Sequence, residues 1–347
     1  MRWLVRVGIA LVALVAVVAA ASAGIWFYAA KSAEAQVREW AQAQRAHGYQ
    51  VTISDMTTTG FPRTVTMALR GVAIAKADDI VPWSWSADGI VANRAVFGSP
   101  SLLVMVLGNQ TLTYRTDGAD QTTRIQARRF SLDVRPASEK TPAQMAIDVS
   151  GLTLARPGDL PPITAKVATI RVTRADGEAV VPEGTRVTIR LDTLVIPENR
   201  RGPLGDTIDV FNTDFTVQRP IETLALPAAL DRWRQSKGYL NVRQSEIRWG
   251  TLNMTFSGAI GVDDHYRPSG YLNSTLKDFG QTIDAFFAAG RIDAKARADI
   301  STMLNFIQGR GVGVGGLGLP MDLAEGNVTV GALTLGTLPA LLPFTAP

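Results

Sequence analysis

The chain contains no cysteine and only two histidines, His47 and His265. The absence of cysteine excludes disulfide bonds, thiolate metal sites, a cysteine nucleophile and a lipid-modified cysteine anchor. Asp263 and Asp264 precede His265, but a polar turn explains this triplet better than a metal site, because no second group of ligands accompanies it. The motifs of serine hydrolases, P-loop nucleotide-binding proteins and zinc peptidases are also missing. We therefore predict no catalytic residue, no metal, no cofactor and no enzymatic activity of this chain alone.

Long runs of like charge are missing as well. Charged residues make up 19% of the chain, and Arg2 and Arg6 contribute to the formal net charge of +4. The densest basic cluster, Arg124, Arg128 and Arg129, is interrupted by apolar residues, as is typical of a solvated strand face. We predict no nucleic-acid partner, because such a partner requires a continuous basic stripe. The apolar share of 46% excludes a disordered chain.

The longest apolar segment lies within residues 1–30. Val7–Ala30 contains no charged residue, and at about 1.5 Å per residue it exceeds the roughly 30 Å hydrocarbon core of a bilayer. Arg2 and Arg6 precede it, so the positive-inside rule places the N-terminus in the cytoplasm, and Trp26–Tyr28 would form an aromatic belt at the far end. We predict a single-pass transmembrane anchor in a bacterial inner membrane, with the bulk of the chain in the periplasm.

A cleaved signal peptide is the alternative interpretation of residues 1–30. Ala21–Ala23 fits the small-residue cleavage pattern, but cleavage there would leave an apolar new N-terminus, which favours retention of the segment. Both interpretations direct the chain to the same compartment. Lys31–Ala46 is rich in good helix formers, and we predict a membrane-proximal helix over 31–48 that ends near His47 and Gly48.

The remaining residues, 49–347, show the two-residue alternation of half-buried antiparallel strands. Val65, Met67 and Leu69 alternate with Thr and Ala, and the ranges 187–191 and 252–256 follow the same pattern. Helical spacing of apolar residues appears in three further segments, Pro227–Gln235, Asp278–Ala289 and Ile292–Gln308. We predict a periplasmic β-rich domain with a few helices that cover a sheet.

One internal similarity indicates a duplication. Residues 64–95 align without a gap on residues 144–175, so that Gly71 falls on Gly151 and Pro82 on Pro162. The alternating triplet Val65, Met67 and Leu69 falls in phase on Met145, Ile147 and Val149. Matched phase and matched turns favour a duplicated multi-strand unit. Such units stack side by side into an extended sheet.

The predicted fold is therefore mainly β, an extended, twisted antiparallel sheet with a few covering helices and the N-terminal transmembrane helix. Many strands with one apolar face need something that buries the face, and few helices are on offer. Three arrangements are compatible with the pattern. The sheet closes on itself as a barrel or sandwich, the helices cover it, or the face stays partly open as a groove for an apolar ligand.

An open groove predicts which side chains would line it. These are Val65, Met67, Leu69, Met145, Ile147 and Val149, with Trp83 and Trp85 as a second element. At strand spacing both tryptophan rings face one side of the sheet, where they form either a core contact or an aromatic shelf for a ligand. A closed sheet predicts instead that all of these residues are fully packed.

Several short motifs resemble an uncharacterised bacterial family, domain of unknown function 2125. The motifs are the early turn Gly60–Arg63, the strand end Leu69–Val72, and the later segments Ile247–Leu252 and Gly258–Asp263. The resemblance covers residues 1–340 approximately. It implies an N-terminal membrane segment followed by a strand-rich exported part, and it brings no catalytic residues.

The chain also resembles, more weakly, the AsmA-like envelope proteins. Gly326–Gly331 and Leu333–Pro339 are similar to the glycine-punctuated strands of that group, which has one membrane helix and a periplasmic sheet thought to conduct lipid. The resemblance implies a membrane-anchored periplasmic protein that binds or passes acyl chains along its sheet, a fold-level analogy. The alternative is a non-enzymatic structural or assembly factor whose partner is another envelope protein.

Overall fold

The structure is a computed structural model that describes residues 2–78, 82–98, 100–116, 118–137, 143–158, 160–197, 202–222, 228–277, 279–309, 317–330 and 333–341, with the side chains of the first helix described from Ser22 onward. The helices are α1 (Arg2–Ala46), α2 (Ala228–Gln235), α3 (Phe279–Ala288) and α4 (Ala294–Gly309). The strands in chain order are β1 (Gln50–Thr59), β2 (Thr64–Lys76), β3 (Trp83–Ala95), β4 (Leu102–Thr116), β5 (Ala119–Gln126), β6 (Arg129–Arg135), β7 (Gln144–Ala155), β8 (Ile163–Thr173), β9 (Arg186–Val195), β10 (Thr207–Gln218), β11 (Tyr239–Trp249), β12 (Leu252–Val262), β13 (Pro268–Lys277), β14 (Leu317–Ala324), β15 (Asn327–Val330) and β16 (Leu333–Thr337).

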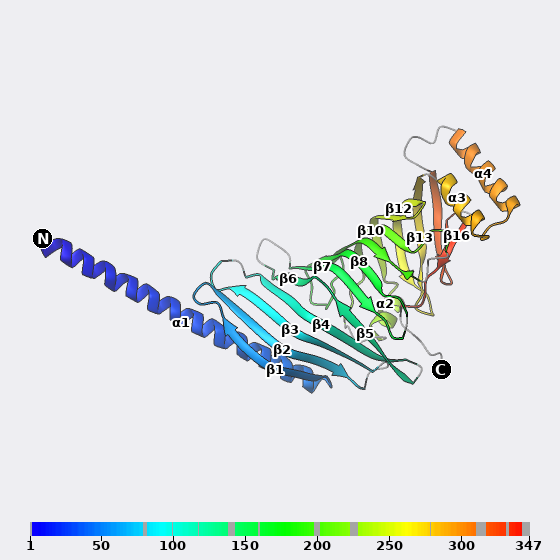
Figure 1. The fold of residues 1–347 in the computed structure, drawn as a ribbon. Helices are drawn as coiled ribbons and strands as arrows, with labels where there is room; N and C mark the ends of the chain where they lie inside the picture. Colours follow the sequence, from blue (N-terminus) through cyan, green and yellow to red (C-terminus); the bar gives the residue numbers. More distant parts are fainter. Residues whose placement is uncertain are drawn as a thin grey trace. The chain divides into compact units, whose positions relative to one another are not determined.

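The chain divides into two compact units. Unit 1 comprises Met1–Pro136 and Leu154–Leu160, and unit 2 comprises Ala137–Thr153 and Pro161–Pro347. In unit 1 the strands lie in the order β1-β2-β3-β4-β5, with β6 paired to β4, and in unit 2 they follow chain order from β7 to β16. The pairs with a known register are all antiparallel, for example β1 with β2 and β12 with β13. The predicted mainly β, antiparallel class with few helices is confirmed (Figure 1).

Helix α1 runs without a break from the predicted membrane segment into the segment predicted as a membrane-proximal helix. It ends where the amide of Tyr49 donates to the carbonyl of Gln44 (3.1 Å) and that of Gly48 to Arg45 (3.1 Å). This pair of bonds is the Schellman arrangement, and Gly48 supplies the positive φ of +83° that it requires. Glycine at this position therefore fixes where the helix stops.

No helix in the portion of the chain with described residues is both long and apolar enough to cross a membrane. The predicted span runs from Val7 to Ala30, and its residues 7–21 lie outside the residues whose side chains are described. The anchor thus stays a prediction.

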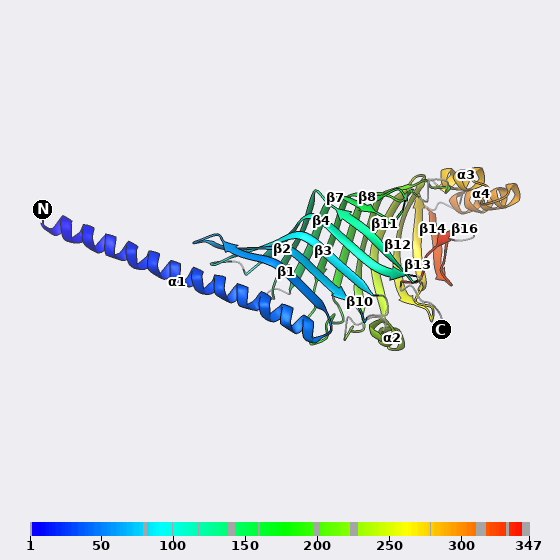
Figure 2. The same cartoon turned by 60° about the horizontal axis from the view of Figure 1, so that its bottom comes forward.

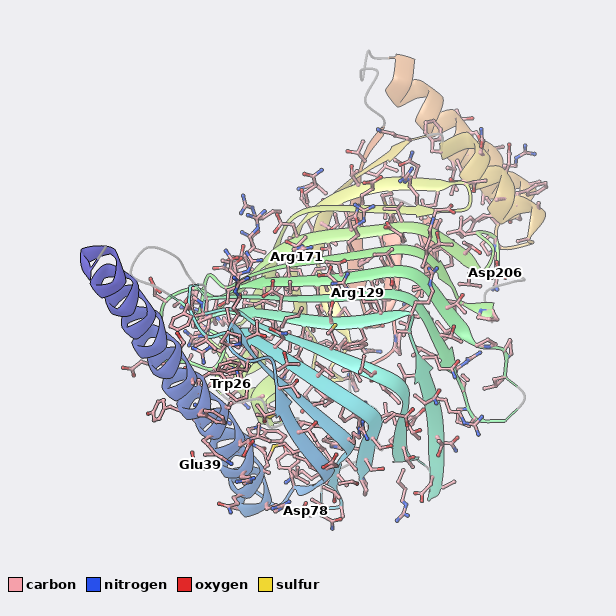
Figure 3. All side chains as sticks on the ribbon, turned by 60° about the vertical axis from the view of Figure 1, so that its left-hand side comes forward. Trp26, Glu39, Asp78, Arg129, Arg171 and Asp206 are labelled. Carbon is pink, nitrogen blue, oxygen red and sulfur yellow. The ribbon has the colours of Figure 1, made fainter. Side chains whose placement is uncertain are left out.

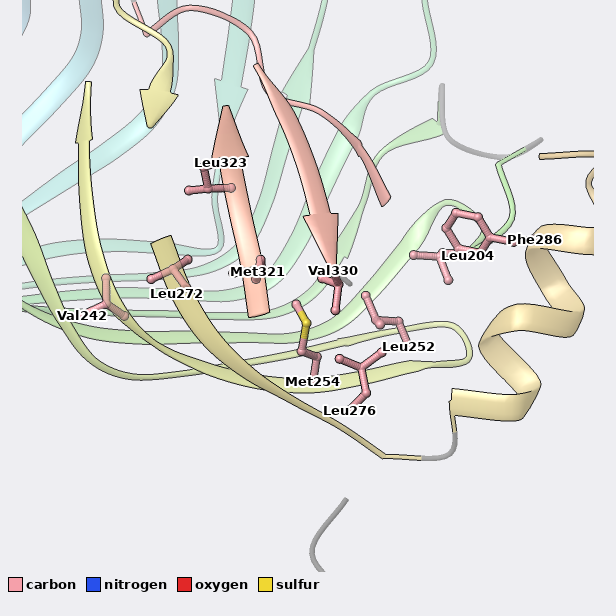
Figure 4. Packing of buried hydrophobic residues seen from close by; sticks show 10 residues of the cluster. All are labelled: Leu204, Val242, Leu252, Met254, Leu272, Leu276, Phe286, Met321, Leu323 and Val330. Atoms are coloured by element: carbon pink, nitrogen blue, oxygen red, sulfur yellow. The ribbon is translucent and has the colours of Figure 1, made fainter. Parts of the chain in front are cut away.

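Strand alternation in unit 2 leads to a buried core. Its side chains come from β11 to β15, from α3 and from Leu204 before β10, and they include Leu252, Met254, Leu272, Leu276, Phe286 and Val330 (Figure 4). Leu272 has no exposed surface and Phe286 only 2%. A buried polar pair, Ser245 donating to Thr213 over 2.7 Å, satisfies the hydroxyl groups that alternation places inside.

One of the predicted helices, α3, packs on this core, and α4 packs on α3 and β14. In α3, Phe286 joins the main cluster, while Ile283 packs with Ile300 of α4 and Leu319 of β14. α3 and α4 lie side by side next to the C-terminal strands (Figure 2). The amphipathic spacing over residues 278–308 therefore marked two helices that pack beside β12 and β14.

The two segments of the predicted duplication begin with matching strand pairs. β2 and β3 start at Thr64 and Trp83, and β7 and β8 start at Gln144 and Ile163, the positions that the alignment superimposes. Gly71 in β2 and Gly151 in β7 both have positive φ, +56° and +60°. The duplication itself stays a prediction.

Candidate functional site

The strand register of unit 1 places one set of apolar side chains on a single face. Directly paired residues of antiparallel strands point to the same side of the sheet, so Leu69 shares a face with Ile90 and Val106. We call this set the apolar face of unit 1. On β2, β3 and β4 it consists of Val65, Met67, Leu69, Val72, Ile74, Trp83, Trp85, Ala87, Ile90, Ala92, Val104, Val106 and Leu112.

The opposite face of unit 1 mixes polar and apolar side chains, since Thr66 and Asn93 share it with Val91, Leu103 and Met105. Asn93 donates to the Thr66 hydroxyl over 2.9 Å, and the hydroxyls of Thr113 and Thr122 are 3.2 Å apart. These bonds run between neighbouring strands and are made at exposed or half-buried positions. The apolar face of unit 1 is therefore the more continuously apolar of the two sides, and the opposite side combines polar pairs with apolar side chains.

A glycine keeps the apolar residues together along β2. Met67 and Val72 are both buried although they are five positions apart, so the strict alternation of the strand is interrupted between them. Gly71 has φ +56°, and a Cβ there would lie 2.4 Å from the Ser54 hydroxyl oxygen. The left-handed backbone of Gly71 shifts by one position the order in which successive side chains of β2 point to the two faces of the sheet. Leu69 and Val72 consequently reach the same face.

Helix α1 covers the β1–β2 side of this face. Its sheet-facing stripe has helical spacing and mostly small side chains: Trp26, Ala30, Ala33, Val37 and Ala41. Trp26 and Ala30 pack on Val65, and the indole of Trp26 donates to the Thr64 carbonyl over 2.6 Å. In Figure 3 Trp26 lies on the sheet side of α1 and Glu39 on its outer side.

Polar contacts fix the same helix further along. Thr58 donates to Glu34 over 3.0 Å, and the guanidinium of Arg45 donates to the Val51 carbonyl over 2.7 Å. The hydrogen bond from Thr58 holds the pKa of Glu34 below its ordinary value against an opposing effect of burial, and Lys31 and Arg38 lower this pKa further. The Glu34 carboxylate is therefore held in its charged form, and its hydrogen bond from Thr58 links α1 to β1.

Away from α1 the face loses its cover. On β2, Val65, Met67 and Val72 are buried, whereas on β4 the apolar members Val104, Val106 and Leu112 are only half-buried. β3 is intermediate, since Ala87 is buried and Ile90 and Ala92 are half-buried. Within the described residues of unit 1, α1 is the one helix, and it contacts β1 and β2.

The predicted ligand-lining residues are distributed between the units. Val65 and Met67 lie beneath or beside α1 and are buried, and Leu69 is half-buried on the same face. In unit 2, β7 carries Met145 and Ile147, which are half-buried, and Val149, which is buried. Each triplet lies on one strand at alternate positions, so each lines one face of its own unit.

The two tryptophans share the apolar face of unit 1, as their spacing predicts. Trp85 pairs with Ile74 and Leu112, and its indole donates to the buried Gln110 over 3.3 Å. The Trp83 ring meets Tyr49 edge to face with centroids 6.3 Å apart. Both tryptophans are half-buried, so they combine a packed edge with remaining accessible surface.

Sequence reasoning missed the β3 and β4 members of the face. Ile90, Ala92, Val104 and Val106 were not among the predicted lining residues, because β4 begins with Leu102–Leu107, in which both faces are apolar and no alternation is visible. Strand pairing could have located them. If β2 and β3 are assumed to form a hairpin, its register makes Ile90 the partner of Leu69, and paired residues lie on the same face.

The triplet Asp263, Asp264 and His265 lies in the turn between β12 and β13. Asp263 accepts the amide of His265 (2.8 Å) and both the amide (2.9 Å) and Nε (2.8 Å) of Arg267. Burial raises the pKa of Asp263, but these hydrogen bonds outweigh it and leave the pKa below its ordinary value. Across the described ranges, no three His, Cys, Asp or Glu side chains are grouped so that they could hold a metal ion.

Comparison with known proteins adds one result. No curated protein and no solved structure matches the chain, so the likeness to AsmA-like envelope proteins stays a prediction. A family model described as an uncharacterised protein conserved in bacteria (DUF2125) matches residues 26–339. The match begins at Trp26, the first buried residue among the described side chains of α1, and covers every strand from β1 to β16 in the described part of the chain. The chain belongs to the DUF2125 family.

Proposed function

We propose that this chain is an inner-membrane protein whose bulk lies in the periplasm and binds lipid. The start of α1 anchors it, and the apolar face of unit 1 holds the acyl chains of lipids. The observation that carries the proposal is the half-buried state of Ile90, Val104, Val106 and Leu112 on that face. Contiguous apolar surface of this kind is uncommon on a protein without a binding role.

The chemistry of the face suits an alkyl chain. On β3 and β4 the paired positions Ala92 with Val104, Ile90 with Val106, and Trp85 with Leu112 are apolar, so a flexible chain lying across these rows meets apolar side chains. Each methylene moved from water to such a surface contributes about 0.8 kcal/mol. Between these rows Gln110 is buried and accepts from Trp85, and the charged residues paired into the same face, Arg94 and Lys76, lie at its two ends.

A second supporting feature is the position of the face on the chain. α1 connects the predicted anchor directly to the strands that carry the face, without a linker. A lipid that leaves the outer leaflet beside α1 would therefore be close to the less covered β3 and β4 part of the face, next to Val65, which α1 buries. The competing function, a scaffold that binds another envelope protein, predicts that a protein partner and not a lipid occupies this surface.

Photo-crosslinking in intact cells distinguishes these functions. The photoreactive amino acid p-benzoylphenylalanine replaces Leu112 on the apolar face or, as the matched control, its neighbour Thr113 on the opposite face. We expect adducts with the mass of phospholipids at position 112 and none at 113. Protein adducts at 112 would support the scaffold instead, and an absence of any adduct at 112 would contradict both functions.

A further inference from the structure

A group of exposed large apolar side chains lies at one end of unit 1. It contains residues of α1 and of the two turns that follow β1 and β3: Ile25, Phe27, Tyr28, Phe61 and Phe97, which we call the interface patch. Phe61 and Phe97 are 56% and 58% exposed although they are fully apolar. Turn tips of a periplasmic sheet would ordinarily carry polar residues, so this placement requires a reason.

The interface patch is held together by ordered contacts. Trp26 meets Phe27 and Phe61 edge to face, with ring centroids 5.3 and 5.7 Å apart. The amide of Val96 donates to the Arg63 carbonyl over 2.9 Å, which joins the two turns. Val96 also packs against the cluster of Trp26, Ala30 and Val65. The exposed rings therefore project from a fixed base.

The charged side chains within the segments that form the patch have one sign. The segments 22–30, 60–66 and 93–98 contain Arg63 and Arg94 but no aspartate or glutamate. Both arginines are exposed, and Arg94 lies opposite Val65 in the β2–β3 register, next to the base of the patch. Aromatic rings with flanking arginines are the combination found where proteins meet the phosphate-rich boundary of a bilayer.

The length of α1 agrees with this position. Beyond the patch, toward its N-terminus, α1 continues past the end of the sheet (Figure 1). The apolar part of that extension, residues 7–25, is about 28 Å long at 1.5 Å per residue, close to the roughly 30 Å hydrocarbon core. A helix that spans with residues 7–25 emerges at the level of Trp26, where the two turn tips lie.

We propose that the interface patch is a bilayer-docking surface, seated in the outer-leaflet headgroup region beside the point where α1 emerges. Phe61, Phe97 and the Ile25–Tyr28 segment enter the acyl boundary, while Arg63 and Arg94 contact lipid phosphates. This inference rests on the membrane anchor in the proposed function and deepens it. Docking brings the Val65 end of the apolar face to the lipid surface, so that an acyl chain need not cross water to reach the face.

Site-directed spin labelling tests the docking directly, because the chain has no cysteine and each variant carries a single thiol. The full-length variants Phe61→Cys, Phe97→Cys and Tyr28→Cys are labelled and reconstituted into vesicles of phosphatidylethanolamine and phosphatidylglycerol. Collisions with oxygen report lipid, and collisions with a water-soluble nickel chelate report solvent. We expect lipid-type accessibility at positions 61, 97 and 28.

Two further labels make the outcome decisive. Ala77→Cys, an exposed position just after the other end of β2, should be solvent-accessible, and Val15→Cys within the predicted span should lie in lipid. Solvent-type accessibility at 61 and 97 with lipid at 15 overturns the docking surface and leaves the anchor intact. Solvent-type accessibility at 15 overturns the anchor, and the docking surface with it.

Discussion

Units 1 and 2 are both built from antiparallel strands with alternating apolar residues, yet their apolar side chains differ in how deeply they are buried. In the part of unit 2 formed by β11 to β15 the face is buried, with Leu272 and Leu276 almost inaccessible and Phe286 of α3 packed on the cluster, whereas Ile170 of β8 and Ile189 of β9 are half-buried. In unit 1 the apolar surface on β4 is half-buried, and α1 packs mainly on β1 and β2. The difference teaches that alternation creates an apolar face, whereas the elements packed on that face decide whether it becomes core or binding surface.

The largest effect is expected from Leu272→Ala in unit 2. The side chain is fully buried among other core residues, so its truncation leaves a cavity and should lower the free energy of unfolding by about 4 kcal/mol. Urea unfolding of the full chain in detergent, followed by circular dichroism, measures the change. A loss below about 1 kcal/mol would mean that the core of unit 2 is not closed, and the contrast with unit 1 would disappear.

Trp26→Ala should have the next largest effect and should act on unit 1. The variant removes the indole that packs on Val65 and donates to the Thr64 carbonyl, at a cost of about 3 kcal/mol. Because α1 covers only the β1–β2 side, we expect faster amide hydrogen exchange in α1 residues 30–46 and in β1, with unit 2 unchanged. Trp40→Ala, on the exposed side of α1, is the control and should have little effect.

Gly71→Ala tests whether the left-handed backbone at Gly71 is needed to keep Leu69 and Val72 on the same face of β2. Alanine at φ +56° is strained by about 1–2 kcal/mol, and its Cβ would also collide with the Ser54 hydroxyl. Gly71→Ala with Ser54→Gly removes the collision and should recover part of the loss in thermal stability. If the single variant were as stable as the wild type, the left-handed backbone at Gly71 would not be what keeps Leu69 and Val72 on one face.

Leu112→Ala should be mild, at about 1 kcal/mol, because the side chain is only half-buried. Measured by the same urea unfolding, it forms the matched counterpart of Leu272→Ala in unit 2. A cost as large as that of Leu272→Ala would indicate that the apolar face of unit 1 is a closed core, and the proposed binding surface would then be rejected.

The smallest effect concerns pH and a polar contact of unit 2. The bidentate contact with Arg186, at 2.8 and 2.6 Å, holds the pKa of Asp214 below its ordinary value. The ion pair therefore stabilises the fold above the pKa of the unfolded carboxyl, about 4, and this contribution is lost as the pH falls through the lower folded value. Asp214→Asn should flatten the decline of the unfolding midpoint below about pH 4, and an unchanged decline would contradict the assignment.

The sequence by itself determined the class of the fold and the position of its helices. Two-residue alternation predicted the β-rich part, and the apolar spacing over Pro227–Gln235 and residues 278–308 located α2, α3 and α4 within a few positions. These signals are local, since a strand or a helix face is written in consecutive residues. The turn motif Gly60–Arg63 likewise indicated the DUF2125 family, to which the chain belongs.

Only the tertiary structure decided which apolar residues are covered. Val65 and Met67 alternate no differently from Leu252 and Met254 in the sequence, and Val104 and Val106 lie in a run without visible alternation. Their burial depends on partners far away along the chain: Trp26 reaches Val65 from α1, and Phe286 reaches the core of unit 2 from α3. Burial is a property of contacts between distant segments, and strand periodicity carries no information about those contacts.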